Sequence, residues 1–410
     1  MEDLTTALMP CLPEDEADAV LVGRVWDPRY EGPRVVTVRG GRVVDLTDEF
    51  PTVAELMEEH DPGQAVAAAS GPTRWSVQDL AGAQTGDQYL PQLLSPIDLQ
   101  VVKACGVTFA DSMIERVIEE RCGGDFTRAT AVRRLVLDTL GGSIAAVTPG
   151  SEEASRVKDV LTAQGMWSQY LEVGLGPHPE VFTKAPVLSS VGHGSAIGIP
   201  SFSVWNNPEP ELVLVVDSAG RIKGATLGND VNLRDVEGRS ALLLGMAKDN
   251  NGSCAIGPFI RLFHTGFALD DLRGEEITLR VDGPDGFLLE GCNSLARISR
   301  SFEELVAATY GSHHQYPDGF ALFTGTLFAP SQDRGEQGMG FTHRYGDTVT
   351  IGSPRLGTLR NVTRPTSELP PWEFGIRAMA AYLARLRSPG GETVATPRRS
   401  PRHGRRPPPG

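Results

Sequence analysis

The feature that constrains the fold most strongly is a strand–turn–strand segment at residues 209–230, which reads EPELVLVVDSAGRIKGATLGND. Its apolar run predicts a buried strand, and the turn residues after it predict a β-hairpin. Side chains two positions apart in a strand share a face, so Glu209 and Glu211 converge. Pro210 points the other way and cannot donate to a strand ladder, which predicts a strand start or a sheet edge. The chain must therefore fold around a β-sheet with two carboxylates at the end of one strand.

The returning strand brings a third carboxylate to the same end. If Asp217 pairs with Gly220 across the turn, Asp230 lies opposite Asn207 and one diagonal step from Glu209. Carboxylates this close raise one another's pKa unless a cation neutralises them. Three oxygen ligands with open positions suit Mg²⁺ or Mn²⁺. The alternative is a solvated hairpin end whose acidic residues face water.

Five further residues could complete a site. Lys248 follows an apolar helical run and either interacts with the helix dipole or lies beside the carboxylates, where it could move protons. Ser112 and Glu115 form Ser-x-x-Glu at a predicted helix start, which is typical of a capping box, with a general acid/base role for Glu115 as the alternative. Glu180 and Thr326 lie in loops rich in turn residues, and either could line a pocket.

The whole chain is predicted to be a β-rich mixed α+β protein. Its 46 glycines and 30 prolines, and the short apolar runs between residues 181 and 365, indicate many strands and turns. We predict a small N-terminal α+β domain over 1–95, ending in a linker at 61–95, and a catalytic domain over 96–388. Residues 389–410 are rich in proline, glycine and arginine and are predicted to be a disordered tail.

Charge and cysteine content exclude several classes of function. A net charge of −14 gives little electrostatic support for nucleic-acid binding. The five scattered cysteines, without a Cys-x-x-Cys pair, indicate reduced thiols. We find no signal peptide and no apolar run of the roughly 18 residues that a membrane span needs. We therefore expect a cytoplasmic protein with neither a nucleic-acid nor a membrane partner.

Several motifs together resemble the fumarylacetoacetate hydrolase superfamily, over roughly residues 100–365. They are, in chain order, GVTFADSMIERVIEE, PEVFTKAP, NNPEPELVLVV, GATLGNDVNLRD, LLLGMAKDNNGSCAIGPF and YPDGFALFTGTLFAP. The resemblance implies a catalytic domain of rolled β structure and a Mg²⁺ site formed by Glu209, Glu211 and Asp230. It also implies that Lys248 is the active-site lysine.

One departure from the family pattern bears on the reaction. The hydrolases carry a His-x-x-Glu dyad that activates water, and Ser112 and Glu115 stand in its place here. Loss of the histidine resembles the branch that dehydrates 2-keto-3-deoxy-pentonates of the xylonate or arabinonate type to 2-oxoglutarate semialdehyde. In that reaction Lys248 or a loop carboxylate would take a C3 proton, and Glu115 or Glu180 would protonate the leaving hydroxyl.

The resemblance also implies substrate contacts and partners. Thr108, Thr326 and Arg234, which lie in the quoted motifs, are expected to bind a small anionic 2-keto acid. A homo-oligomer, either a dimer or a tetramer, is usual in the superfamily. The alternatives are an acylpyruvate or fumarylacetoacetate-type hydrolase, an oxaloacetate-type decarboxylase, and a catalytically inert binding protein.

Overall fold

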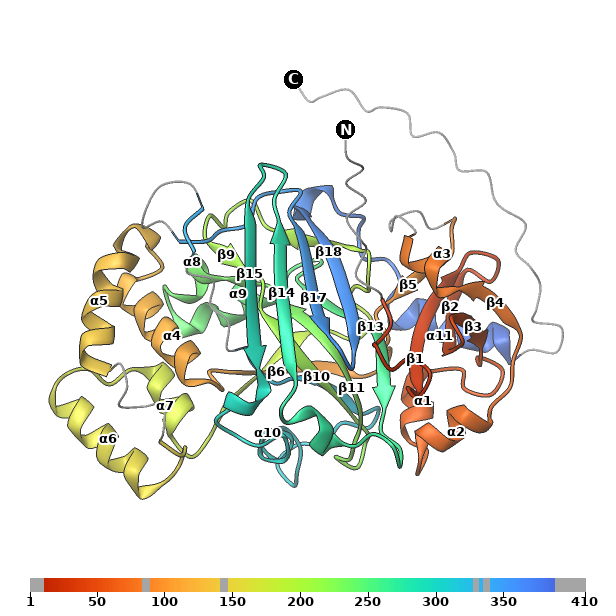
Figure 1. Cartoon of the computed structure of the whole chain (residues 1–410), viewed down its shortest axis with the longest axis horizontal. Coiled ribbons are helices and arrows are strands. Elements are labelled where there is room, and N and C mark those ends of the chain that lie inside the picture. The colour runs from red at the N-terminus through yellow and green to blue at the C-terminus, as the bar shows by residue number, and fades with distance from the viewer. Residues whose placement is uncertain (1–10, 83–88, 141–146, 327–331, 335–339, 388–410) are drawn as a thin grey trace.

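A computed structural model describes residues 11–82, 89–140, 147–326, 332–334 and 340–387. Within these residues two large sheets form the centre of the molecule, with helices on both sides (Figure 1). The β-rich mixed fold predicted from the sequence is confirmed. The predicted tail at 389–410 lies outside the described residues. No described helix is long and apolar enough to cross a membrane.

The larger sheet has eleven strands among the described residues. Its spatial order is β4 (Thr73–Ser76), β3 (Arg42–Asp45), β2 (Gly32–Arg39), β1 (Leu21–Asp27), β13 (Cys254–Leu262), β11 (Ile222–Asp230), β10 (Pro210–Val216), β16 (Phe320–Phe323), β6 (Val101–Gly106) and β7 (Glu180–Ala185), with β5 (Gln92–Leu94) paired to β1. The second sheet runs β15 (Leu288–Ser294), β14 (Glu276–Asp282), β17 (Thr348–Ser353), β18 (Gly357–Pro365) and β8 (Ala196–Ile199). A short pair joins β9 (Asn206–Asn207) to β12 (Asn232–Leu233).

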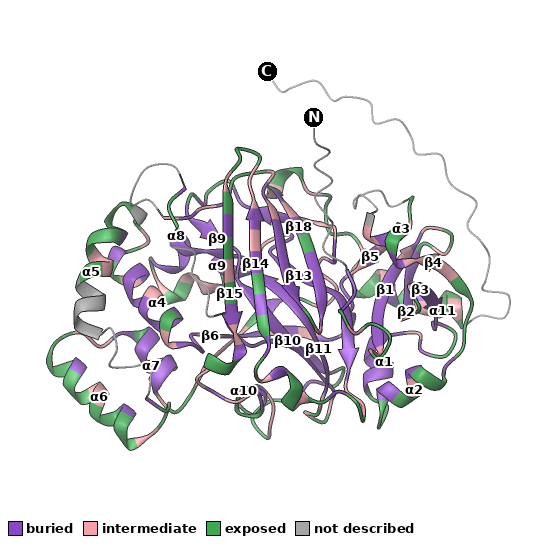
Figure 2. Ribbon diagram, in the orientation of Figure 1, coloured by how far each residue is buried: buried purple, intermediate pink, exposed green. Residues whose placement is uncertain are grey.

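Strand β10 is buried on both faces. Leu212 and Leu214 belong to the core between the two sheets, where β10 contacts β14 and β11 contacts β17. Val213 and Val215 belong to a second core on the opposite face. Figure 2 shows the central strands almost wholly buried. This double burial explains the uninterrupted apolar run in the sequence, and it means that Glu211, on the face of Val213, is also withdrawn from water.

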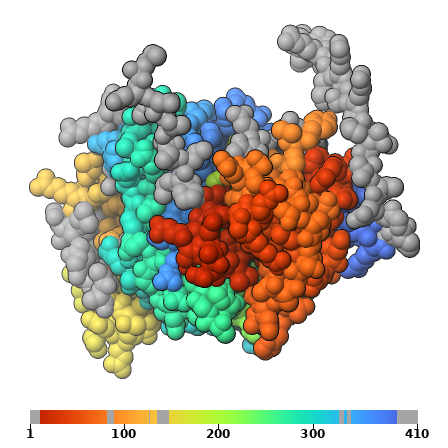
Figure 3. All heavy atoms as spheres, turned by 45° about the vertical axis from the view of Figure 1, so that its right-hand side comes forward, coloured from red at the N-terminus to blue at the C-terminus, as the bar shows by residue number. Residues whose placement is uncertain are grey.

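The N-terminal strands extend the larger sheet, since β1 is hydrogen-bonded to β13. Figure 3 shows this region, red to orange, packed against the strands in green and cyan. The expected linker at 61–95 is wrong, because it contains α2 (Pro62–Ala68), β4, α3 (Val77–Gly82) and β5. Pro62 begins a helix that Asp61 caps, so a proline taken for a chain breaker is a helix start. The domain division at residue 95 stays a prediction.

The remaining helices flank the sheets. Those on the left of Figure 1 pack around α4, and they include α5, α6 and α7. The bounds are α1 (Val53–Met57), α4 (Ala110–Cys122), α5 (Ala129–Leu140), α6 (Glu152–Ala163), α7 (Gln169–Leu175), α8 (Arg234–Glu237), α9 (Leu244–Lys248), α10 (Phe302–Thr309) and α11 (Ile376–Leu386). Helix α4 places one polar face over the end of the β10–β11 hairpin, where the candidate site lies.

Candidate metal centre

The β10–β11 hairpin sets the geometry of the site. Asp230 lies opposite Glu209, and its amide donates to the Glu209 carbonyl at 3.1 Å. The predicted pairing of Asp230 with Asn207 is wrong by two residues, because the loop spans 217–221 and a register shift follows at Val216. A two-residue shift keeps each side chain on its face, so the expected convergence still occurs.

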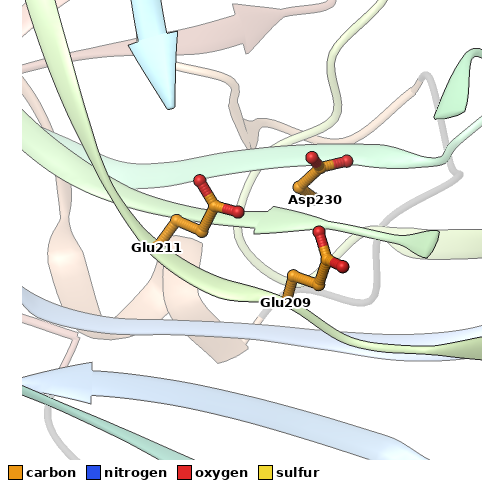
Figure 4. A group of neighbouring side chains, drawn as sticks. All are labelled: Glu209, Glu211 and Asp230. Atoms are coloured by element: carbon orange, nitrogen blue, oxygen red, sulfur yellow. The ribbon is translucent and has the colours of Figure 1, made fainter. Parts of the chain in front are cut away.

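The structure brings the three predicted carboxylates together. Ligand oxygens of Glu209, Glu211 and Asp230 all lie within 4.8 Å of one another, and each residue is at most 4 % exposed. Figure 4 shows the three side chains next to one another. Because buried carboxylates repel one another strongly, such a group needs compensating positive charge.

Two buried lysines and the partly buried Arg116 compensate two of the carboxylates. The Lys248 ammonium donates to Glu209 at 2.6 Å and to Asp230 at 3.1 Å. Lys184 pairs with the other Asp230 oxygen at 2.8 Å, and Arg116 with the other Glu209 oxygen at 2.6 Å. Burial opposes the charge on Lys248, but its carboxylate neighbours outweigh burial and raise its pKa above the ordinary value.

Glu211 is left without such a partner. Among the described residues it forms no ion pair, and its carboxylate accepts a hydrogen bond from the Gly325 amide at 2.7 Å. Burial raises its pKa well above the usual range, and the charges of Asp230 and Glu209 add to this effect. A buried, uncompensated carboxylate beside two others fits an oxygen-liganded divalent cation. Glu209, Glu211 and Asp230 can therefore hold such an ion.

A pocket of about 320 Å³ opens onto the carboxylates. It collects most of the residues predicted from the sequence, including Ser112, Glu180 and Thr326 along with the three carboxylates and Lys248. An adjoining pocket of about 260 Å³ shares Ser112, Arg116, Glu209 and Thr326 with it. No histidine is among the described residues that line either pocket.

Glu180 is the first residue of β7, and its carboxyl group lies against the backbone of β6. A Cβ at Gly106 would come within 2.0 Å of Glu180 Oε2, so glycine is needed for this approach. Burial raises the pKa of Glu180. The positive charges of Arg116 and Lys248 lower this pKa by less, and the negative charge of Glu209 raises it further. No described residue forms an ion pair with Glu180. A carboxyl group of this kind is suited to exchange protons with a ligand.

Ser112 and Glu115 do not form the predicted capping box. Helix α4 begins at Ala110, so Ser112 is its third residue, and the Ser112 hydroxyl donates to the Phe109 carbonyl at 2.8 Å. Glu115 lies in the adjoining pocket, where Arg133 binds it at 2.6 Å and Arg234 at 3.1 Å. Both carboxylate oxygens of Glu115 thus accept hydrogen bonds from guanidinium groups.

The three predicted substrate-binding residues lie in different surroundings. Thr326 lines both pockets. Arg234 lines the adjoining pocket, but it is 2 % exposed, pairs with Glu119 at 2.6 Å and stacks on Trp205. Thr108 lines neither pocket, and its hydroxyl donates to the Thr324 carbonyl at 2.7 Å. Thr108 thereby holds the backbone at Thr324, next to the Gly325 amide that donates to Glu211.

The sequence analysis missed four charged residues around the site, of which three are buried and Arg116 is partly buried: Arg116, Glu119, Lys184 and Glu237. Periodicity could have found three of them. Arg116 and Glu119 follow Ser112 at helical spacing of four and seven residues, which places them on one face. Lys184 follows Glu180 at an even spacing, which in a regular strand predicts a shared face, although the register of β7 shifts beside Lys184.

The fold and this carboxylate site define a known class. Residues 158–364 match the model of the fumarylacetoacetate (FAA) hydrolase C-terminal domain, which is half of the chain. The chain belongs to the fumarylacetoacetate hydrolase family. The resemblance drawn from the sequence motifs is thereby confirmed.

Two relatives are named as dehydratases. A 2-dehydro-3-deoxy-D-arabinonate dehydratase of Saccharolobus solfataricus is 36 % identical over 181 residues, 44 % of this chain and 57 % of that protein. A probable 2-keto-3-deoxyxylonate dehydratase of Haloferax volcanii is 30 % identical over 270 residues, 59 % of this chain and 87 % of that protein. The chain therefore spans little more than half the length of the first relative.

Solved structures share the fold. A 2-keto-3-deoxy-D-arabinonate dehydratase complexed with magnesium and 2,5-dioxopentanoate has a TM-score of 0.59 and 23 % identity, covering 84 % of this chain and 99 % of that one. A fumarylacetoacetate hydrolase from Exiguobacterium antarcticum has a TM-score of 0.51 and 16 % identity, covering 85 % and 100 %.

Replacing Glu211 tests whether the three carboxylates bind an ion. We expect Glu211→Gln to weaken Mg²⁺ binding at least about tenfold. The substitution removes the carboxylate that forms no ion pair with a described residue of the protein. At 100 times the wild-type Kd, Mg²⁺ should stabilise the wild type by about 2.7 kcal/mol and the variant by less. Calorimetric titration and thermal unfolding of chelator-treated protein measure both effects.

Glu275→Gln is the matched control, since Glu275 is also a buried carboxylate but lies outside both pockets, bonded to Ser353 at 2.6 Å. It should keep the wild-type affinity for Mg²⁺. Equal affinity in the Glu211 variant and the wild type would contradict the assignment.

Proposed function

We propose that this chain is a Mg²⁺-dependent dehydratase that converts a 2-keto-3-deoxy-pentonate, of the xylonate or arabinonate type, to 2,5-dioxopentanoate, which is 2-oxoglutarate semialdehyde. Two relatives named for this activity support the proposal. The bound magnesium and 2,5-dioxopentanoate of the structural neighbour support it further. The substrate would be a small anionic keto acid.

The observation that carries the choice of dehydration is the composition of the pocket. The described lining residues provide a carboxylate triad and the unpaired Glu180, but no imidazole. The Ser112 hydroxyl, at the position of the hydrolase histidine, is bonded to a backbone carbonyl. A serine hydroxyl is too weak a base to activate water for carbon–carbon cleavage. A proton transfer by one carboxyl group is within reach of these residues.

Glu209, Glu211 and Asp230 would hold the divalent ion, with Mg²⁺ as the proposed ion and Mn²⁺ fitting the same oxygen ligands. When bound, the ion supplies stabilisation for the negative charge that develops on the keto-acid oxygens as a C3 proton is lost. Lys248 orients two of the ligands by donating to Glu209 and Asp230 at once.

Glu180 is the proposed proton carrier. As a carboxylate it takes a proton from C3, a double bond forms between C3 and C4, and the C4–oxygen bond breaks. The Glu180 carboxyl group returns the proton to the departing hydroxyl, which leaves as water. A proton then shifts from C5 to C3, which leaves an enol with its double bond between C4 and C5, and this enol tautomerises to the aldehyde. Loss of one water from the pentonate accounts for every atom of the product.

Glu115 is proposed to have a different role from the one predicted. Because guanidinium groups of Arg133 and Arg234 bind its oxygens, we assign it to holding the wall of the adjoining pocket. The homo-oligomer, dimer or tetramer, and the cytoplasmic location stay predictions.

Product analysis tests the reaction. We expect the purified protein with Mg²⁺ to convert 2-keto-3-deoxy-D-xylonate, which is the same compound as 2-keto-3-deoxy-D-arabinonate, or its enantiomer 2-keto-3-deoxy-L-arabinonate, to 2,5-dioxopentanoate, detected as a hydrazone by mass spectrometry. Chelation should abolish turnover, and added Mg²⁺ should restore it. Pyruvate with glycolaldehyde would instead show retro-aldol cleavage. Turnover of acylpyruvates, with no action on the pentonates, would favour the hydrolase.

A pair of variants separates the two candidate acids. Glu180→Gln should lower kcat by about 10²–10⁴-fold while Mg²⁺ binding is kept, because general acid–base catalysis contributes about that much. Glu115→Gln should lower it less, since Glu115 is bound to two arginines. Single-turnover kinetics and ion titration of both variants provide the comparison. A larger loss in the Glu115 variant would transfer the role to Glu115.

A further inference from the structure

Arg116 forms the wall between the two pockets. It lies on α4 with Ser112 and Glu119 on the same face, and it lines both cavities. Its guanidinium group contacts three different carboxylates. One terminal nitrogen binds Glu119 at 2.8 Å and Glu237 at 2.5 Å, and the other binds Glu209 at 2.6 Å. A planar fork with several donors can make these contacts simultaneously.

The contact with Glu209 fixes the rotamer of a proposed metal ligand. Arg116 holds Glu209 Oε1, and the second oxygen, Oε2, accepts a hydrogen bond from Lys248, which also donates to Asp230. The Glu209 backbone is held separately, since its amide donates to Asn229 Oδ1 at 3.1 Å. Anchored at both ends, the Glu209 side chain presents one oxygen toward the other two carboxylates.

Arg116 is itself fixed by its remaining partners. Glu119 is shared with Arg234, which binds it at 2.6 Å, and both residues are buried. Burial opposes the charge on Arg116, but Glu119, Glu237 and Glu209 outweigh burial and raise its pKa. Each hydrogen-bond partner of the guanidinium group among the described residues is therefore a carboxylate of the protein.

We infer that Arg116 is a positioning residue for the metal centre, which acts through Glu209 by holding its Oε1 so that Oε2 is preorganised to bind the divalent ion. Partners that orient a metal ligand commonly contribute 10–100-fold to metal affinity. Lysine is a poor substitute, because its single ammonium group cannot replace two terminal nitrogens that contact three carboxylates. The inference rests on the proposed metal site and is independent of the substrate.

The test is Mg²⁺ binding by calorimetry, with full-length, chelator-treated protein. Arg116→Lys should raise the Kd for Mg²⁺ about 10–100-fold. Arg116→Ala should raise the Kd for Mg²⁺ at least as much. Methylguanidinium, which can occupy the vacated site, should restore part of the affinity for Mg²⁺. Methylammonium at the same concentration controls for ionic strength and should recover less. Should the alanine variant fail to fold, the lysine variant decides the question.

Arg334→Lys is the matched control. Arg334 is buried and pairs with two carboxylates, Asp347 at 2.6 Å and Asp285 at 2.8 Å, but it lines neither pocket. It should lower the thermal midpoint and leave the Kd for Mg²⁺ within about twofold of the wild type. A Kd within twofold in Arg116→Lys as well would overturn the inference and leave Arg116 a structural residue. A wild type that binds no divalent ion would refute the metal centre itself.

Discussion

The structure depends on the compensation of carboxylates buried at the end of the β10–β11 hairpin. A series of ion pairs runs from the helices into the sheet, and the charged residues along it alternate in sign. In order they are Arg133, Glu115, Arg234, Glu119, Arg116, Glu209, Lys248, Asp230 and Lys184. Removing one member of such a set exposes its neighbour to the full cost of an unpaired buried charge. Through these ion pairs, the position of α4 and the geometry of the carboxylates depend on each other.

The same set of charges explains why the site suits a cation. The series of ion pairs contains five cations, whereas seven carboxyl groups belong to the series or line the pocket beside it. This leaves an excess of carboxyl groups over cations around the pocket. It is concentrated where Glu211 has no ion-pair partner among the described residues and where Glu180 faces the pocket. Metal binding and a proton-carrying carboxyl group thus share one electrostatic origin.

The features of the site that depend on local alternation along a strand could be predicted from the sequence, whereas those that depend on packing could not. Alternation along a strand placed Glu209, Glu211 and Asp230 on one face, and this conclusion survived a register error because the error was two residues. Loop length and the shift at Val216 depend on packing, which alternation does not encode. Periodicity could place Arg116 on the same helix face as Ser112, but its role also depends on Glu209 and Glu237, which lie 93 and 121 residues away in sequence.

The most direct measurement is a crystal structure of the protein soaked in Mn²⁺, with anomalous diffraction used to locate the ion. The account predicts one strong anomalous peak per chain, coordinated by carboxylate oxygens of Glu209, Glu211 and Asp230, with Arg116 still bound to Glu209. A peak elsewhere, or none at these three carboxylates at saturating Mn²⁺, would contradict it.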